Sequence, residues 1–251
     1  MTLFGYRIPM MAALLVWCVA WEIVGRLELL LLFPPLSRVI VAMGDVVTSR
    51  SFAEAAWITL YSYAWGMALA IVCGIALGVL MGRVRAADRL LNMWVNMFLS
   101  APLSALVPVI MILLGIGTTT VIATVFMFAV WIIALDTRAG VMNVPRSLVE
   151  MAASFGASRW QTTTRILLLA ALPEILAGVR LGFIRGVKGV VIGQLLVSII
   201  GVGALFTIYS NNFLMEHFWA LTLMLFVFAL TVGEILARIE ARIDYYAGER
   251  S

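Results

Sequence analysis

Six long apolar stretches decide what this 251-residue chain can fold into. A helix that crosses the ~30 Å hydrocarbon core of a bilayer needs about 20 mostly apolar residues. The stretches that reach or approach this length are 8–24, 57–81, 90–114, 118–135, 173–200 and 218–236. Hydrophobic residues make up 64% of the chain and charged residues only 12%, which is too little charge for a water-soluble surface. The sequence therefore predicts an all-α membrane protein with six transmembrane helices.

The distribution of arginine predicts how these helices are oriented, because Lys and Arg concentrate on the cytoplasmic side of a membrane. We interpret stretch 8–24 as a retained helix, since Trp17, Trp21 and Glu22 lie where a signal peptide would be cleaved. The arginines then expected inside are Arg7, Arg83, Arg85, Arg89, Arg138, Arg146, Arg159, Arg165, Arg238, Arg242 and Arg250. Those expected outside are Arg26, Arg38 and Arg50. This excess predicts that both termini are cytoplasmic, and it explains the basic net charge without nucleic-acid binding.

Two connections are too long to be simple turns. Residues 27–56 are expected on the outer surface, and their amphipathic part, 37–47, has Ser37 as its expected helix N-cap. Residues 136–172 form the longest inside connection, and a structureless loop of this length is unusual in a compact protein. We therefore treat 1–251 as a single transmembrane domain with these two connections outside the bilayer.

Small residues recur at four-residue intervals in two of the apolar stretches. In the second stretch they are Gly66, Ala70, Gly74, Gly78 and Gly82, and in the fifth they are Gly178, Gly182 and Gly186. Such spacing puts them on one helix face, where they let a second helix approach closely. Packing within one subunit is favoured over a dedicated dimer seam.

The chain lacks the motifs of an enzyme that works alone. It contains no G-x-x-x-x-G-K-[ST], H-E-x-x-H, C-x-x-C or G-x-S-x-G pattern, and its single histidine, His217, leaves little scope for metal chemistry. An ATP-driven process would therefore need a nucleotide-binding site on another chain.

The inside connection contains the most informative segment, 148–173, with the sequence LVEMAASFGASRWQTTTRILLLAALP. A short helix is expected from Arg146 to Phe155, followed by Gly156 in a tight turn and by a second helix from Ser158. The resulting helix–turn–helix would expose a face of small and apolar residues to the cytoplasm. We expect this face to dock on a partner.

This segment resembles the EAA loop of ABC importer permeases. The matching positions are Glu150, Met151, Ala152, Gly156 and Ile166. The surrounding SFGASRW and LLLAALP, together with SAPLSALVPVIMILLGIG and FPPLS elsewhere, are similar to the subfamily that imports nitrate, sulfonates and taurine. The resemblance covers about residues 32–242. The sequence departs from the pattern at Met151, where Ala is usual, at Leu169, where Pro is usual, and at Gln194, where an acidic residue is common.

The resemblance implies a type I permease bundle that carries no cofactor of its own. ATP and Mg would be bound by a cytoplasmic ABC ATPase dimer, which the coupling helix would contact. The residues of this contact would be Glu150, Met151, Ala152, Ala153, Ser154, Phe155, Gly156 and Ala157. A second permease copy or a paralogue would complete the pathway, and a periplasmic binding protein would deliver the solute. The location implied is the bacterial inner membrane, where the chain would be surrounded by lipid.

Two cations lie deep in the fifth stretch. Counted from Pro173, Lys188 lies roughly 22 Å into the bilayer, and Arg185 shares its helix face. Cations at such depth are expensive and face a partner or an aqueous path. They either line a pathway for an anion or form structural pairs with Glu234 or Glu22. Weaker candidates for the pathway lining are Ser100, Ser104, Gln194 and Ser198.

Other classes of function are less consistent with these features. A self-sufficient secondary transporter or channel would have no ATPase for the exposed loop to engage, and no inverted repeat is evident. A membrane enzyme lacks site chemistry, and a scaffold would leave the loop and the deep cations unexplained. The outer segment Glu216-His217-Phe218-Trp219 either contacts a binding protein or caps the sixth helix.

Overall fold

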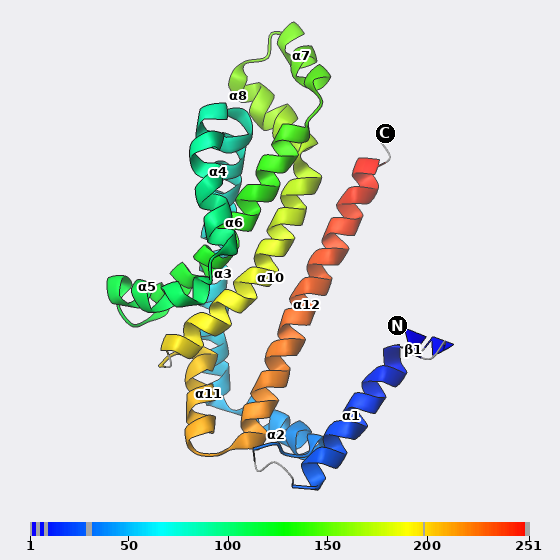
Figure 1. The fold of residues 1–251 in the computed structure, drawn as a ribbon, viewed down its shortest axis with the longest axis vertical. Coiled ribbons are helices and arrows are strands. Elements are labelled where there is room, and N and C mark those ends of the chain that lie inside the picture. The colour runs from blue at the N-terminus through cyan, green and yellow to red at the C-terminus, as the bar shows by residue number, and fades with distance from the viewer. Residues whose placement is uncertain (1, 4–5, 8–9, 29–31, 198, 249–251) are drawn as a thin grey trace.

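The computed structural model describes residues 2–3, 6–7, 10–28, 32–197 and 199–248. Two short strands, β1 (Thr2–Leu3) and β2 (Tyr6–Arg7), pair antiparallel near the N-terminus. All the other regular elements of the described residues are helices, so the predicted all-α class is confirmed (Figure 1). The helices are α1 (Met10–Arg26), α2 (Leu36–Thr48), α3 (Arg50–Arg83), α4 (Arg85–Ser100), η1 (Leu103–Leu106), α5 (Val107–Leu114), α6 (Thr118–Asn143), α7 (Arg146–Ser154), α8 (Arg159–Thr162), the π-helical turn η2 (Thr163–Leu167), α9 (Leu168–Ala170), α10 (Leu172–Val197), α11 (Gly201–Asn211) and α12 (Met215–Gly248).

Three described helices are long and apolar enough to cross a membrane on their own: α3, α6 and the 215–235 part of α12. Two bent pairs pass the same test together, and each could form one more span. They are α4 with 103–114, bent by 97°, and 159–170 with α10, bent by 68°. Helix α1 has 17 residues, which is short for a bilayer. The structure therefore offers three to five spans by length and composition, and the total of six stays a prediction.

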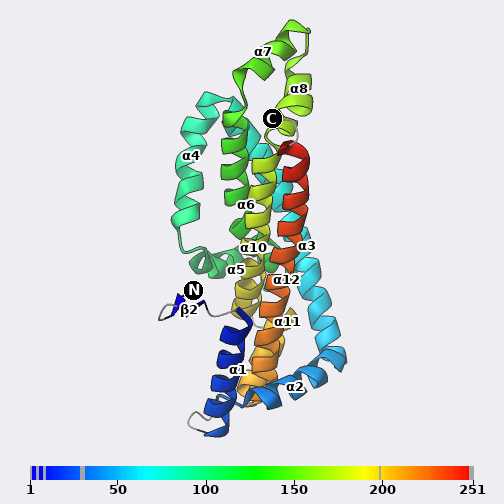
Figure 2. The same ribbon diagram turned by 90° about the vertical axis from the view of Figure 1, so that its right-hand side faces the viewer.

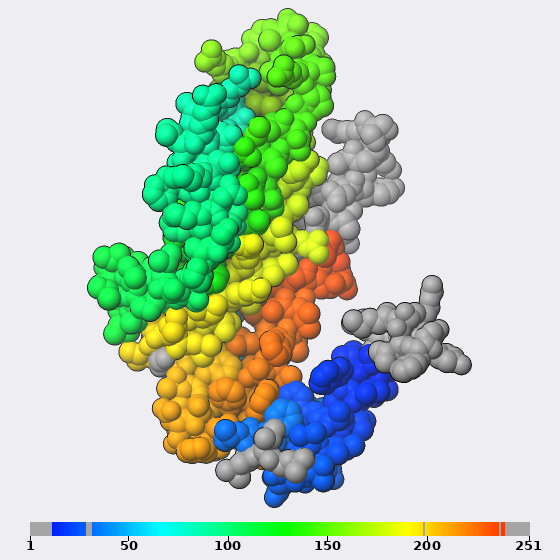
Figure 3. All heavy atoms as spheres, in the orientation of Figure 1, coloured from blue at the N-terminus to red at the C-terminus, as the bar shows by residue number. Residues whose placement is uncertain are grey.

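The third apolar stretch, 90–114, is not the single helix that its hydropathy predicts. Pro102 disfavours a helical conformation in the residue before it, and Ala101 is accordingly extended, with ψ 146°. The chain restarts as η1, and α5 then leaves the bundle sideways (Figure 3). Hydropathy records only that these residues are apolar, so the prediction of one straight helix was wrong.

Close packing around α6 forms the centre of the molecule. A Cβ atom placed on any of four glycines of α3 would come within 2.5–2.8 Å of a side chain on α6, so only glycine permits this approach. The pairs are Gly66 with Val125, Gly74 with Ile133, Gly78 with Thr137 and Gly82 with Val141. On α10, Gly178 and Gly182 approach α6 equally closely, at 2.7 Å. The predicted packing of the small-residue faces within one subunit is confirmed.

The two ends of the bundle carry different connections. Figure 1 and Figure 2 place α7 and α8 at one end, and α2 with the turn between α1 and α2 at the other. At the α7 end, Arg138 of α6 and Asp88 of α4 form a bidentate ion pair, in which the Arg138 Nη2 donates to Asp88 Oδ2 at 2.8 Å. Because charge-assisted bidentate pairs are strong and directional, this pair ties α4 to the central helices.

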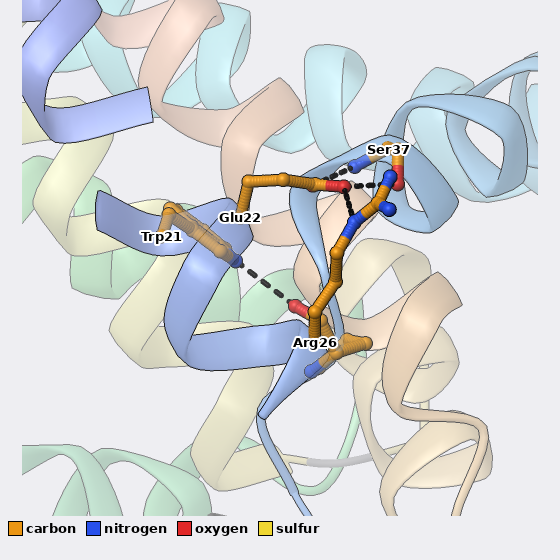
Figure 4. A network of polar contacts seen from close by, with 5 residues as sticks. Trp21, Glu22, Arg26 and Ser37 are labelled. Atoms are coloured by element: carbon orange, nitrogen blue, oxygen red, sulfur yellow. Dashed lines mark hydrogen bonds and ion pairs between the residues drawn. The ribbon is translucent and has the colours of Figure 1, made fainter. Parts of the chain in front are cut away.

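Ser37 does not cap α2, contrary to the sequence prediction. Pro35 occupies the N-cap position, and the carboxylate of Glu22 from α1 takes the role expected of Ser37. Its oxygens accept hydrogen bonds from the Ser37 amide at 2.9 Å and from the Ser37 hydroxyl at 2.8 Å, and Arg26 pairs with it at 2.6 Å (Figure 4). A carboxylate is favourable at a helix N-terminus, so this contact anchors α1 to α2.

Aromatic side chains reinforce the same corner. The ring of Trp21 lies 5.0 Å from that of Phe33 and 5.3 Å from that of Trp219 on α12. Both indoles donate to the backbone, Trp21 to the Pro34 carbonyl and Trp219 to the Leu32 carbonyl. Along the rest of α1, large side chains such as Trp17 are exposed.

Candidate functional site

The turn between α7 and α8 has the geometry expected from the sequence. Gly156 has φ +72°, a conformation that costs a residue with a side chain about 1–2 kcal/mol. The Gly156 amide donates to the Ala153 carbonyl at 2.9 Å, and the Ala157 amide donates to the Ala152 carbonyl at 3.0 Å. These two bonds make a Schellman motif. The turn is therefore held by backbone hydrogen bonds alone.

A reciprocal cap fixes the start of the next helix. The Ser158 hydroxyl accepts from the Gln161 amide, and the Gln161 side chain accepts from the Ser158 amide. The helix predicted to begin at Ser158 is therefore confirmed. Arg83, at the end of α3, donates to the Arg159 carbonyl at 3.3 Å and to the Thr163 hydroxyl. These contacts hold α8 against the end of α3.

The predicted contact segment lies on the outer surface of this helix–turn–helix. Of its eight residues, Ala152 is buried and Ala157 is half-buried, whereas the other six are exposed: Glu150, Met151, Ala153, Ser154, Phe155 and Gly156. Phe155 is 85% exposed. Trp160, in α8, is 75% exposed and was missing from the predicted contact set. Its position in the first turn of the helix that Ser158 caps is the signal that could have included it.

A second candidate site is an open pocket in which Lys188 and Ser104 are exposed and Arg185 is half-buried. Arg185 and Lys188 of α10 line a cavity of about 250 Å³ between α10, α6 and the bend after α4. The other lining residues are Leu99, Ala101, Leu103, Ser104, Phe128 and Ile192. The structure thus brings three of the predicted pathway residues together: Arg185, Lys188 and Ser104. Ser100 is exposed and does not line the cavity, although its neighbours Leu99 and Ala101 do.

Gln194 lies apart from this cavity. Its side chain is 1% exposed, and its Oε1 accepts a hydrogen bond from the Thr59 hydroxyl at 3.0 Å. The Thr59 hydroxyl in turn accepts from the Val202 amide at 3.2 Å, so this cluster joins α3, α10 and α11. Ser198, the remaining predicted residue of the pathway, lies outside the described residues.

The counterions predicted for the two deep cations are engaged elsewhere. Glu22 binds Arg26 and Ser37, and Glu234 pairs with Arg238 one turn along α12 at 3.2 Å. The structural pairs predicted for Arg185 and Lys188 were therefore wrong. Long side chains pair most readily with a neighbour one helical turn away, which is how both glutamates are used.

The acid that packs against the helix of Arg185 is instead Asp136 on α6, which lies opposite Gly178. Asp136 was absent from the sequence predictions, because the predicted helix ended at residue 135, whereas α6 continues to Asn143. The spacing of glycines marks a packing face on α10 but does not identify the residue opposite it; in the structure a Cβ added at Gly178 would lie 2.7 Å from the Asp136 Cβ.

The opposite end of the bundle also has an open cavity. It has a volume of about 480 Å³ and is lined by residues between α1 and α2 and by residues around the start of α12, among them Glu28, Arg38, Glu216 and His217. Arg38 and Glu216 approach to 3.6 Å across it. Phe218, in contrast, packs against Phe206 at 5.1 Å. Glu216 and Phe218, both in the first turn of α12, thus face different neighbours: Glu216 faces Arg38 of α2, and Phe218 packs on α11. Among the described residues, no group of His, Cys, Asp and Glu is arranged to hold a metal ion.

Sequence comparison identifies the family. Residues 70–245 match the model of the binding-protein-dependent transport system inner membrane component, and the chain belongs to this family of inner-membrane permease components. It is 31% identical to the riboflavin transport system permease protein of Chloroflexus aurantiacus over 147 residues, which are 56% of this chain and 55% of that protein. It is 35% identical to the taurine transport system permease protein of Escherichia coli over 102 residues, 41% of this chain and 37% of that protein. The chain thus spans about half the length of the curated relatives it matches, or less.

Solved structures support the same fold. An inward-facing structure of the MetNI methionine ABC transporter matches 77% of this chain and 94% of its own chain, with a TM-score of 0.60 at 21% identity. A crystal structure of an amino acid ABC transporter matches 79% of this chain and 97% of its own, with a TM-score of 0.63 at 16% identity. The arrangement of helices is therefore that of ABC importer permeases.

Proposed function

We propose that the chain is the permease subunit of an ATP-driven ABC importer and forms an alternating-access pathway for a small anionic solute. The observation that carries this proposal is the exposed α7–α8 unit, which backbone and side-chain hydrogen bonds hold in a fixed shape between α6 and α10, the two helices beside the cationic cavity. Its exposed aromatic residues, Phe155 and Trp160, are typical of a protein contact surface. A relative named for aliphatic sulfonates, which are anions, supports an anionic solute.

The partner at α7 would be a cytoplasmic ABC ATPase dimer, which binds ATP and Mg, so the permease itself needs no cofactor. The residues 150–157 would fit a groove on each ATPase. When ATP closes the ATPase dimer, α7 moves with it, and the close contacts of α6 with α3 and α10 transmit this movement into the bilayer. Packed glycine contacts favour rigid-body movement of these helices.

The cavity with Arg185 and Lys188 would hold the solute on its way across. Two cations in a low-dielectric cavity raise the local concentration of anions and oppose the entry of cations. Ser104 would supply a hydrogen-bonding hydroxyl. The cations act as fixed binding charges and take part in no chemical step.

The remaining partners complete the importer. A second permease copy or a paralogue would supply the other half of the pathway by two-fold symmetry. A periplasmic binding protein would deliver the solute at the end where Arg38 and Glu216 lie. In this arrangement the chain crosses the bacterial inner membrane six times, with α1 as the first span and both termini in the cytoplasm.

The substitution Gly156→Asp tests the coupling role. Aspartate at φ +72° strains the turn and adds a charge to the contact surface, so uptake and co-purification of the ATPase should be lost while the permease stays in the membrane. Gly115→Asp is a control for a new charge at a glycine of positive φ, because Gly115 has φ +81° and open surroundings but lies on the turn between α5 and α6. Full uptake by Gly156→Asp cells would refute the coupling assignment. Transport by the permease without any ATPase would favour a secondary transporter or channel.

The substitution Lys188→Gln tests the pathway role separately. Removing this charge should weaken uptake of an anionic solute and leave ATPase co-purification intact. Unchanged transport of an anion would remove Lys188 from the pathway.

A further inference from the structure

An apolar pocket lies between α2, α3, α11 and α12, away from the cationic cavity. It has a volume of about 340 Å³ and shares no lining residue with that cavity. Its walls include Phe52 and Ala56 of α3, Met43 of α2, and Met224 and Phe228 of α12. The pocket is therefore a separate site, and neither the coupling surface nor the solute pathway uses it.

The pocket offers little to a polar ligand. Among the described residues that line it, Thr59 alone has a polar side chain. The Thr59 hydroxyl lies 2.8 Å from the Ala55 carbonyl oxygen and 3.0 Å from the Gln194 Oε1. It also accepts a hydrogen bond from the Val202 amide at 3.2 Å, so its bonding capacity is used within the protein. A buried water needs about 2–4 polar partners, and an apolar cavity without them stays dry and binds apolar molecules. The ligand that fits this pocket is therefore apolar.

The pocket opens onto a surface that faces hydrocarbon. Helix α3 and the apolar part of α12 are each long enough to cross a membrane, and residues 55–82 and 218–233 of these helices include no Asp, Glu, Lys or Arg. Two of the lining residues, Leu60 and Val227, are exposed, at 46% and 60%. Because the chain belongs to a family of inner-membrane components, the apolar molecules that reach this surface are the acyl chains of lipids.

The pocket also separates two packed parts of the protein. One hydrophobic cluster is built on α3, α6 and α10, and Phe228 packs at its edge. A second cluster is built on α2, α11 and α12, and Met43 and Phe52 pack at its edge. Side chains around an empty space lose the dispersion contacts that they would make with a neighbour. An apolar ligand in the pocket would therefore restore contacts between the two clusters.

We propose that this pocket binds one acyl chain of a membrane phospholipid. The acyl chain would fill the space between the two clusters and stabilise α2, α11 and α12 against α3. The site depends only on the location of the protein in a membrane, so its test is independent of the coupling role of α7 and of the cationic cavity. The alternative occupants are a detergent molecule, in the purified protein, and a helix of a second permease copy.

Titration with a photoreactive lipid tests the site directly. The full-length protein is purified in dodecyl maltoside, which displaces loosely held lipid, and phosphatidylethanolamine with a diazirine in its acyl chain is added. At equimolar lipid, Met43 and Met224 should be labelled about tenfold more than Leu69 and Val72, a preference equal to about 1.4 kcal/mol. Leu69 and Val72 are the reference because they are exposed on α3 and lie outside the pocket. Labelling at Met43 and Met224 no greater than at the reference residues would overturn the proposal, whether detergent or a second copy fills the pocket.

A substitution in the α3 wall tests whether the lipid is inside the pocket. Ala56→Phe fills the space and should reduce the labelling of Met43 and Met224 about tenfold. Ala68→Phe is the matched control, because Ala68 is exposed on the same helix and does not line the pocket; it should leave this labelling unchanged. Undiminished labelling in Ala56→Phe, or an equal reduction in Ala68→Phe, would refute the site.

Thermal unfolding gives a second measurement. Added phosphatidylethanolamine should raise the melting temperature of the parent protein, because a ligand that binds only the folded state stabilises it. The rise should be smaller in Ala56→Phe, in which a side chain already occupies the space, and the same as in the parent in Ala68→Phe. A melting temperature of the parent that does not respond to the lipid would also overturn the proposal, since the acyl chain would then add nothing to the contact between the two clusters.

Discussion

The close contact between α3 and α6 predicts that two Gly→Ala substitutions, one inside this contact and one outside it, change the free energy of unfolding in opposite directions. At Gly78, an added Cβ would lie 2.5 Å from the Thr137 Cβ and 2.6 Å from the Ala134 carbonyl oxygen. The Ala134 oxygen belongs to the backbone, and the Thr137 Cβ is fixed to it, so neither atom can rotate away. The two helices must therefore separate to admit an alanine at position 78. At Gly44, in the exposed face of α2, an added Cβ has no neighbour within 4 Å.

The magnitudes follow from two opposing effects. Alanine gains about 1 kcal/mol over glycine in a helix interior, and overpacking a tight contact costs about 1–3 kcal/mol. Because the Gly78 contacts are shorter than real Cβ contacts ever are, we take the upper end of that range. Gly78→Ala should then destabilise the protein by about 2 kcal/mol, and Gly44→Ala should stabilise it by about 1 kcal/mol.

Thermal unfolding of the detergent-solubilised protein, followed by tryptophan fluorescence, measures both effects. The Tm should fall by roughly 4–8 °C in Gly78→Ala and rise by roughly 2–4 °C in Gly44→Ala. Equal melting temperatures for the two variants would refute the reasoning, since the same chemical change would then be insensitive to the distance between the helices.

Two further contacts make testable predictions. Asp88→Asn should destabilise the protein by about 1–3 kcal/mol, because both side chains of the Asp88–Arg138 pair are only 21% exposed. The double variant with Arg138→Gln should lose less stability than the sum of the two single variants. Strictly additive losses in melting experiments would argue against a direct pair. Glu22→Gln should weaken the anchor between α1 and α2, because the Ser37 amide then loses a charged acceptor. Hydrogen exchange at the Ser37 amide should therefore accelerate. An unchanged exchange rate would show that the aromatic cluster alone holds α1 against α2.

Much of the fold could be predicted from the sequence, because hydropathy, glycine spacing and turn residues act locally. The short helix before Gly156 follows from helix propensity and a left-handed glycine, and both are set by a few consecutive residues. The series of glycines on α3 identifies a packing face for the same reason. The identity of the opposite helix, α6, is a long-range property that this spacing does not contain.

Two of the errors, at Ser37 and Asp136, share a physical cause, which is the presence of a partner from a distant part of the chain. Ser37 is a good N-cap by residue type, but Glu22 from another helix is a stronger acceptor and displaces it. Asp136 was placed in a loop because a charge ends an apolar stretch. In the folded chain, Gly178 across the interface leaves the space in which this charge remains within the helix.

The turn at Gly156 has a consequence for how such a subunit could change its partner. Its shape depends on backbone hydrogen bonds between Ala152, Ala153, Gly156 and Ala157, and the exposed side chains of α7 take no part in them. Side chains such as Glu150 and Met151 can therefore be exchanged while the turn keeps its shape. Recognition and transmission of force are then separable, and transplanting a foreign α7 surface onto this turn becomes a practical way to redirect the permease to another ATPase.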